Sequence, residues 1–203
     1  MTCVKICGIT SILDAKKACE LGAHALGFVF YEQSPRYISA EQANAIVEQL
    51  PPFVVPIALF VDAKKLQIDA VIKSNHRWQI QFHGNETDSY CHSFGRSYIK
   101  ALRVKDGFDI MGEIDKYPNA SAILLDAFKA GVPGGTGERF NWNLVPKSTD
   151  KPLVLAGGLT PENVQSAITS VQPYAVDVSG GVEQSKGIKD HKKLALFLSG
   201  AKN

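Results

Sequence analysis

Residues 153–164, LVLAGGLTPENV, have the strand–turn–helix pattern from which the fold class can be predicted. A strand-like apolar run ends in two glycines, and Pro161 then stands where a helix begins. Residues 175–183, AVDVSGGVE, repeat the first half of this pattern. A strand that leads through a tight turn into a helix, and then into another strand, is typical of a parallel sheet covered by helices.

The same alternation extends along the rest of the chain. Short apolar runs predict strands, and longer amphipathic segments predict helices between them. The predicted strands cover residues 3–8, 25–30, 54–61, 78–82, 97–103, 122–126, 153–156 and 175–178. The predicted helices cover about residues 11–21, 39–50, 63–74, 86–94 and 189–198. Eight such strands can form either an open, doubly wound sheet or a closed (β/α)8 barrel.

The positions of the unusual residues favour the barrel. Reactive, charged or glycine residues stand at the C-terminal ends of several predicted strands: Cys7, Arg103, Asp126, Gly157, Gly158 and residues 179–181. In a barrel these ends share one mouth, whereas an open sheet would spread them along an edge. We therefore predict an α/β protein that forms a single (β/α)8 TIM barrel, with residues 1–203 as one domain.

Composition excludes several classes of protein. The chain has 203 residues, 22 of them Lys or Arg and 20 Asp or Glu, so its formal net charge is +2. Because the charges nearly balance, the chain has no overall positive electrostatic field that would attract a polyanion. We therefore expect neither a nucleic-acid partner nor a membrane partner. No apolar stretch is long enough to predict a transmembrane helix, and the N-terminus does not resemble a secretory signal. A cytoplasmic location is expected.

Four cysteines occur, at positions 3, 7, 19 and 91. The chain is too long and too apolar to need a disulfide scaffold, so we expect reduced thiols. The cysteines and the five histidines have no spacing typical of a metal site, and no metal is expected.

The first strand suggests a catalytic thiol. Side chains alternate along a strand, so Cys3, Lys5 and Cys7 share one face, which we expect to point into the barrel. A lysine there needs a charged partner or a ligand. A thiol beside an ammonium group can have a lowered pKa and act as a base or nucleophile. Buried cysteine is usually a small hydrophobe, which is the interpretation kept for the other three cysteines, but the mouth position favours a functional Cys7.

Three further features point to acid/base chemistry on an anionic ligand. Asp126 ends an apolar strand and is either a turn residue or a catalytic carboxylate. The glycine pairs after the last two strands are either plain tight turns or a backbone site for phosphate, which barrels often hold in these two loops. Arg36, in the loop after the second strand, is either an ordinary surface residue or the partner of a substrate carboxylate.

With these residues in view, the chain resembles the phosphoribosylanthranilate isomerase family of tryptophan biosynthesis. The motifs are spread over nearly the whole chain in the expected order. They are VKICGIT at 4–10, GFVF at 27–30, SPRYI at 34–38, QFHG at 81–84, LLDAF at 124–128, GGTGERFNW at 134–142, LAGGLTPENV at 155–164 and DVSGGVE at 177–183. Relatives commonly have DVSSGVE, so Gly180 replaces a serine; residues 128–133 are variable in the family and suggest a flexible loop over the mouth.

The resemblance implies a barrel that performs an Amadori rearrangement without a metal or organic cofactor. N-(5-phosphoribosyl)anthranilate would become 1-(2-carboxyphenylamino)-1-deoxyribulose 5-phosphate. Asp126 would be the general acid that opens the sugar ring, and Cys7 the general base that takes the proton from C2. Arg36 would bind the anthranilate carboxylate. The phosphate would bind around the last two strand ends, at Gly157, Gly158, Ser179, Gly180 and Gly181. The partner is this small phosphoribosyl substrate, and a monomer or a homodimer is expected.

Three other hypotheses remain open. The sister isomerase of histidine biosynthesis performs the same sugar chemistry, but its family has an aspartate where this chain has Cys7. A non-catalytic barrel that binds phospho-sugars would keep the glycine loops but would not need Cys7 and Asp126 together. A thiol-redox function lacks the Cys-x-x-Cys motif that it would normally use.

Overall fold

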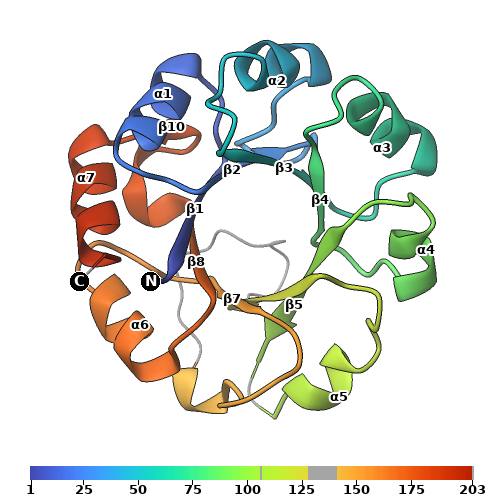
Figure 1. Cartoon of the computed structure of the whole chain (residues 1–203), viewed down its shortest axis with the longest axis vertical. Helices are drawn as coiled ribbons and strands as arrows, with labels where there is room; N and C mark the ends of the chain where they lie inside the picture. The colour runs from blue at the N-terminus through green and yellow to red at the C-terminus, as the bar shows by residue number, and fades with distance from the viewer. Residues whose placement is uncertain (106, 128–140, 203) are drawn as a thin grey trace.

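This computed structural model describes residues 1–105, 107–127 and 141–202. Eight parallel strands form a closed barrel in chain order, and β8 pairs with β1 to complete it (Figure 1). The strands are β1 (Cys3–Cys7), β2 (Ala25–Val29), β3 (Val55–Phe60), β4 (Gln79–Phe82), β5 (Tyr98–Val104), β6 (Ala122–Ala127), β7 (Leu153–Leu155) and β8 (Ala175–Val178). The predicted barrel is confirmed, and each strand end lies within one residue of its predicted position.

The helices surround the ring of strands (Figure 1). They are α1 (Ile12–Glu20), α2 (Ala40–Val47), α3 (Lys65–Ile72), α4 (Asp88–His92), α5 (Ile110–Ile114), α6 (Val164–Val171) and α7 (His191–Gly200). Between β6 and β7, the described residues contain only the 3₁₀ helix η1 (Trp142–Leu144). After β8 the chain forms another 3₁₀ helix, η2 (Gly180–Val182), and a small hairpin of β9 (Glu183–Ser185) and β10 (Ile188–Lys189), none of which was predicted.

Short polar side chains set the starts of several helices. Ser11 Oγ accepts from the backbone N–H of Asp14 at the start of α1. Ser39 forms a capping box with Gln42 at the start of α2, as its position in the sequence suggested. Asp190 accepts from two backbone N–H groups of α7, so this helix begins at residue 191 and not at the predicted residue 189.

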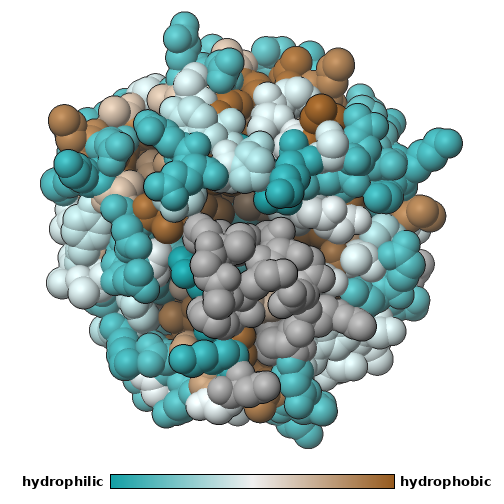
Figure 2. Space-filling view, turned by 180° about the vertical axis from the view of Figure 1, so that it is seen from behind, coloured by the Kyte–Doolittle hydropathy of each residue, from teal (hydrophilic) through white to brown (hydrophobic). Residues whose placement is uncertain are grey.

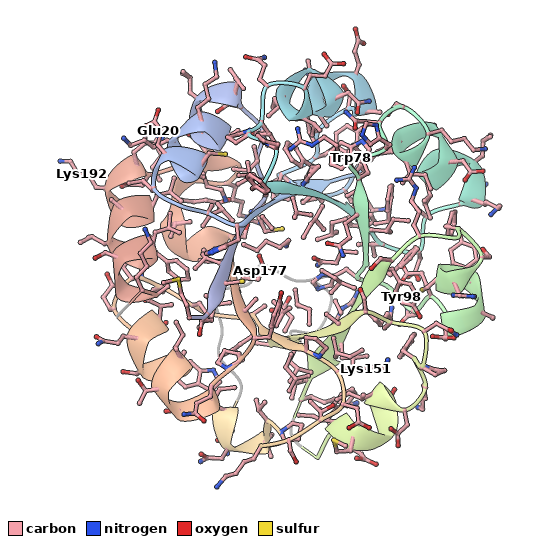
Figure 3. All side chains as sticks on the ribbon, viewed as in Figure 1. Glu20, Trp78, Tyr98, Lys151, Asp177 and Lys192 are labelled. Atoms are coloured by element: carbon pink, nitrogen blue, oxygen red, sulfur yellow. The ribbon has the colours of Figure 1, made fainter. Side chains whose placement is uncertain are left out.

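The alternation within β1 separates two cores. Val4 and Ile6 belong to the large apolar cluster between the strands and the helices, whereas Cys7 faces the inside of the barrel. In Figure 3, Trp78 and Tyr98 lie outside the ring of strands, among the surrounding helices, and Asp177 lies within the ring. The strands are therefore apolar on their outer side and carry most of their chemistry on the inner side, as expected of a barrel.

Lys5 has the buried partner that the sequence predicted it would need. It pairs in register with Asp177 of β8, and its Nζ lies 3.0 Å from Asp177 Oδ1. Although burial alone would lower the pKa of Lys5, the charge of Asp177 and its hydrogen bond raise it. Because β1 and β8 close the barrel, this ion pair crosses the seam between the first and last strands.

The face of the molecule seen in Figure 2 is largely hydrophilic. Figure 2 shows hydrophilic side chains around most of the rim, with apolar side chains scattered between them. Among the helices of the described ranges, none combines the length and the apolar character needed to cross a membrane.

Candidate active site

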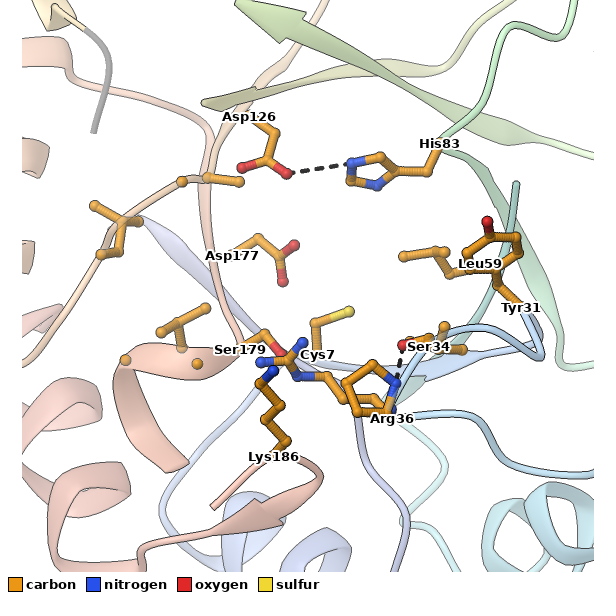
Figure 4. A pocket seen from close by; sticks show the side chains of 18 of the residues that line it. Cys7, Tyr31, Ser34, Arg36, Leu59, His83, Asp126, Asp177, Ser179 and Lys186 are labelled. Atoms are coloured by element: carbon orange, nitrogen blue, oxygen red, sulfur yellow. Dashed lines mark hydrogen bonds and ion pairs between the residues drawn. The ribbon is translucent and has the colours of Figure 1, made fainter. Parts of the chain in front are cut away.

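The C-terminal ends of the strands surround a cavity of about 400 Å³ (Figure 4). Every predicted site residue lines it: Cys7, Arg36, Asp126, Gly157, Gly158, Ser179, Gly180 and Gly181. These residues come from the ends of β1, β6, β7 and β8 and from the loop after β2. The barrel thus brings together residues that are far apart in the sequence, from Cys7 to Gly181.

Cys7 is the last residue of β1 and is 5% exposed. Burial raises the pKa of its thiol above the ordinary value of 9.0, and the nearby Lys5 ammonium only partly offsets this. The pKa is thus not lowered, as a neighbouring ammonium group alone would lower it, because the loss of hydration outweighs the positive charge.

Gly27 makes room for this thiol. It pairs in register with Cys7 across β1 and β2. A Cβ atom at Gly27 would lie 2.7 Å from Cys7 Sγ and about 3.1 Å from Lys5 Nζ, well inside normal contact. The missing side chain therefore allows the thiol and the ammonium group to approach each other inside the barrel.

Asp126 lies near the end of β6 and faces the same cavity as Cys7 (Figure 4). Its Oδ1 accepts from the backbone N–H of Ala127 at 2.9 Å, and its Oδ2 lies 3.2 Å from His83 Nε2. The carboxyl group is buried, with 5% of the residue exposed. A carboxyl group held in this way can exchange a proton with a ligand in the cavity.

Arg36 is held by a carboxylate of the protein itself. Its Nε and Nη2 donate to Oε1 and Oε2 of Glu183, both at 2.8 Å. Burial alone would raise the pKa of Glu183, but the hydrogen bonds from Arg36 and the charge of Lys189 lower it. This edge of the guanidinium group is therefore occupied, and Nη1 is the part that can still meet a ligand.

The glycines let two loops approach each other closely. Gly157 and Gly158 both have positive φ angles, +82° and +64°. A Cβ atom at Gly157 would lie 2.5 Å from the backbone N of Ala127, and one at Gly181 would lie 1.9 Å from the carbonyl oxygen of Leu159. Side chains do not fit at these two positions, so main-chain groups line this end of the cavity.

Ser179 adds a buried hydroxyl group to the wall of the cavity. Its Oγ is buried and has no hydrogen-bond partner in the parts of the chain that the structure describes. A buried hydroxyl group at a cavity wall costs free energy unless something bonds to it. Ser179 therefore has an open hydrogen-bonding position for a ligand.

Several charged or ionisable residues at or beside the cavity were not among the predicted site residues. His83, Asp177 and Lys186 line it, and buried Lys189 joins the strand ends below it. Lys189 Nζ donates to the carbonyls of Cys7 and Ser179 and to Glu183 Oε1, at 2.6, 3.3 and 3.0 Å. His83 and Asp177 were detectable, because each stands near the end of an apolar strand as Asp126 does. The lysines lie in or beside an unpredicted hairpin.

Two other residues at strand ends do not line the cavity. Asp62 has a φ angle of +48°, and its carboxylate accepts from the side chain and the backbone of Asn85. Arg103 Nη2 donates to the His83 carbonyl at 2.7 Å. Within the described ranges, no group of three or more His, Cys, Asp or Glu residues is arranged to hold a metal ion.

Comparison with known proteins identifies the family. The family model of N-(5'phosphoribosyl)anthranilate (PRA) isomerase matches residues 4–200. The chain belongs to this family. A PRA isomerase from Marinomonas sp. (strain MWYL1) is 62% identical over 203 residues, which cover 100% of this chain and 99% of the relative.

Solved PRA isomerase structures have the same fold. The crystal structure from Thermotoga maritima matches with a TM-score of 0.91 at 42% identity and covers 100% of this chain and 99% of that one. A second, with a TM-score of 0.88 at 41% identity and the same coverage, is a complex with reduced 1-(o-carboxyphenylamino)-1-deoxyribulose 5-phosphate. The motif segment 134–140 and the variable segment 128–133 lie outside the described residues, so the expected loop over the mouth is not described.

Proposed function

We propose that this chain catalyses the Amadori rearrangement of N-(5-phosphoribosyl)anthranilate to 1-(2-carboxyphenylamino)-1-deoxyribulose 5-phosphate, a step of tryptophan biosynthesis. The observation that carries this proposal is the position of Cys7 and Asp126 in one cavity, together with groups suited to anions. A thiol and a carboxyl group are sufficient for two proton transfers without a redox step. Family membership supports the same reaction.

In the first step, Asp126 acts as the general acid. It gives its proton to the furanose ring oxygen, the bond between C1 and that oxygen breaks, and the electron pair of the anthranilate nitrogen forms the C1=N bond. The hydrogen bond from Ala127 N–H, 2.9 Å from Oδ1, stabilises the carboxylate that remains.

In the second step, Cys7 acts as the general base. Its thiolate removes the proton from C2, the electrons move into a C1=C2 bond, and the positive nitrogen becomes neutral. The enolamine then tautomerises to the ketone. Because burial raises the pKa of Cys7, the thiol must lose its proton before it can act as the base. The Lys5 ammonium group stabilises the thiolate that forms.

The two ends of the substrate are both anionic, and the cavity offers a different group to each. We assign the carboxylate to Arg36, through the edge that Glu183 does not occupy. We assign the phosphate to main-chain N–H groups near Gly157, Gly158, Gly180 and Gly181 and to the Ser179 hydroxyl. Gly180 lacks the hydroxyl that relatives commonly have there, so the Ser179 hydroxyl carries more of the side-chain contact in this chain.

We also propose that the enzyme acts in the cytoplasm. A catalytic thiol must stay reduced, which the cytoplasm favours, and the four cysteines are all free. We further propose that residues 1–203 act as one domain, as a monomer or a homodimer. Size-exclusion chromatography with light scattering distinguishes these two states.

The test is turnover of two substrates by the purified protein. With N-(5-phosphoribosyl)anthranilate we expect a fall in anthranilate fluorescence, and expression should rescue a tryptophan-requiring host that lacks this step. Turnover of only the histidine-pathway substrate would favour the sister isomerase. Binding of a product analogue without turnover of either substrate would favour a phospho-sugar binding protein, and both results would contradict the proposal.

A further inference from the structure

The side chain of His83 is fixed more firmly than lining a cavity requires. The residue follows β4, where its N–H donates to the Phe60 carbonyl at 2.8 Å and its carbonyl accepts from Arg103 Nη2 at 2.7 Å. Its ring nitrogens lie 3.0 Å from Gln81 Nε2 and 3.2 Å from Asp126 Oδ2. The residue is only 6% exposed. Hydrogen bonds therefore hold the backbone N–H and carbonyl of His83 and both nitrogens of its imidazole ring.

Gln81 sets the tautomer of this imidazole. An amide nitrogen can only donate, so His83 Nδ1 accepts from Gln81 Nε2. The proton of the neutral ring is then on Nε2 and is directed at Asp126 Oδ2 (Figure 4). Gln81 is fully buried, and its Oε1 has no partner among the residues that the structure describes. The amide is thus oriented toward the imidazole although its own oxygen is left unpaired.

We infer that His83 is a positioning residue of this reaction, which orients the carboxyl group of Asp126 and stabilises the negative charge that it acquires on giving up its proton. The inference rests on the proposed function, in which Asp126 is the general acid. The proton that moves is that of Asp126, and it goes to the sugar ring oxygen. His83 keeps its own proton on Nε2 throughout.

The expected effect is on the rate and not on binding. An N–H group bonds more strongly to a carboxylate than to a neutral carboxyl group. The contact from His83 therefore strengthens as Asp126 loses its proton, which stabilises the transition state more than the bound substrate. Its removal should lower kcat and leave KM nearly unchanged.

The experiment compares three histidine variants by anthranilate fluorescence. For His83→Ala we expect kcat to fall by roughly 10- to 100-fold, the effect of one hydrogen bond to a charged group. His83→Gln should recover much of this loss, because its amide N–H can reach the position of Nε2. His76→Ala, an exposed residue outside the cavity, is the matched control and should behave as the parent.

A variant of Gln81 and a double variant distinguish a positioning role of His83 from a merely structural one. Gln81→Leu keeps His83 but removes the group that sets its tautomer, so we expect a smaller loss in kcat. His83→Ala combined with Asp126→Asn should lose no more than Asp126→Asn alone, whereas a merely structural role would give additive losses. Thermal unfolding of each variant shows whether it is folded.

The inference fails if His83→Ala keeps the kcat of the parent within about twofold, loses only affinity, or is not improved by the glutamine replacement. It also fails if the losses in the double variant add. The proposed function fails separately, if the parent shows no turnover or if Asp126→Asn is as active as the parent.

Discussion

Cys7 depends on two neighbours on the inner face of the barrel. Lys5 stabilises its thiolate, and the bare backbone of Gly27 gives the sulfur atom its space. The sequence alone was enough to select Cys7, because its inward face and its position at a strand end can both be read from the pattern. It did not predict the raised pKa, because the net shift depends on how completely the folded chain excludes water.

Gly27→Ala tests the close packing around the thiol. The added methyl group would lie 2.7 Å from Cys7 Sγ, so the sulfur must move. We expect kcat/KM to fall by at least about tenfold and stability to fall by about 1–3 kcal/mol, as measured by steady-state kinetics and urea unfolding. Gly95→Ala is the control for the kinetics alone: its Cβ would meet nothing within 4 Å, but the φ angle of +62° makes alanine unfavourable there, so its stability is expected to fall for a different reason. Unchanged kinetics in Gly27→Ala would show that the position of the sulfur is not critical.

The pH dependence of the rate tests the identity of the base. The pKa of Cys7 is raised, so the thiolate forms as pH rises, and kcat/KM should increase toward alkaline pH. In Cys7→Asp the base is a carboxylate that titrates at far lower pH, so this limb should move to the acid side. The profile is measured from roughly pH 5 to pH 10. If the limb keeps its midpoint in Cys7→Asp, another group is the base.

At the scale of elements, the strands were far easier to predict than the segments after β6 and β8. The strands are short buried segments with apolar residues on at least their outer side, so the local sequence pattern marks them. The 3₁₀ helices η1 and η2 and the β9–β10 hairpin are held by tertiary contacts, such as the bond from Thr10 Oγ1 to the Gly187 carbonyl at 2.5 Å. No local pattern encodes a contact between residues 177 positions apart. The partners of Arg36 and the position of Lys189 were missed for this reason.

The start of α7 depends on one side chain. Asp190 Oδ1 accepts from the backbone N–H groups of Lys192 and Lys193 at 2.9 and 3.1 Å. Asp190→Ala should lower the free energy of unfolding by about 1 kcal/mol and leave kcat unchanged. Lys192→Ala, on the exposed side of the same helix turn, is the matched control and should change stability little. Equal unfolding free energies for Asp190→Ala and the parent would contradict this role of the cap.

At the scale of the whole molecule, the barrel closes where β1 meets β8. The Lys5–Asp177 ion pair crosses this seam inside the barrel, with both side chains less than a tenth exposed. A buried charge is tolerated only when it is paired, so the pair makes closure and the chemistry near Cys7 depend on the same contacts.

Asp177→Asn should be strongly destabilising. It leaves the Lys5 ammonium buried without its charged partner, at a cost of about 3–5 kcal/mol. Replacement of both partners by apolar residues, in Lys5→Met with Asp177→Leu, should destabilise less than the single change. The free energy of unfolding in urea measures both. If the double variant is less stable than Asp177→Asn, the unpaired Lys5 ammonium is not the main source of the loss.

The most direct test of the account is the turnover number of Cys7→Ala and of Asp126→Asn with N-(5-phosphoribosyl)anthranilate. Each change removes one proton-transfer group, and we expect kcat to fall by roughly 10²- to 10⁴-fold or more. The affinity for the reduced product analogue should largely survive in both variants. Near-normal turnover in either variant would contradict the assignment of Cys7 as the base or of Asp126 as the acid.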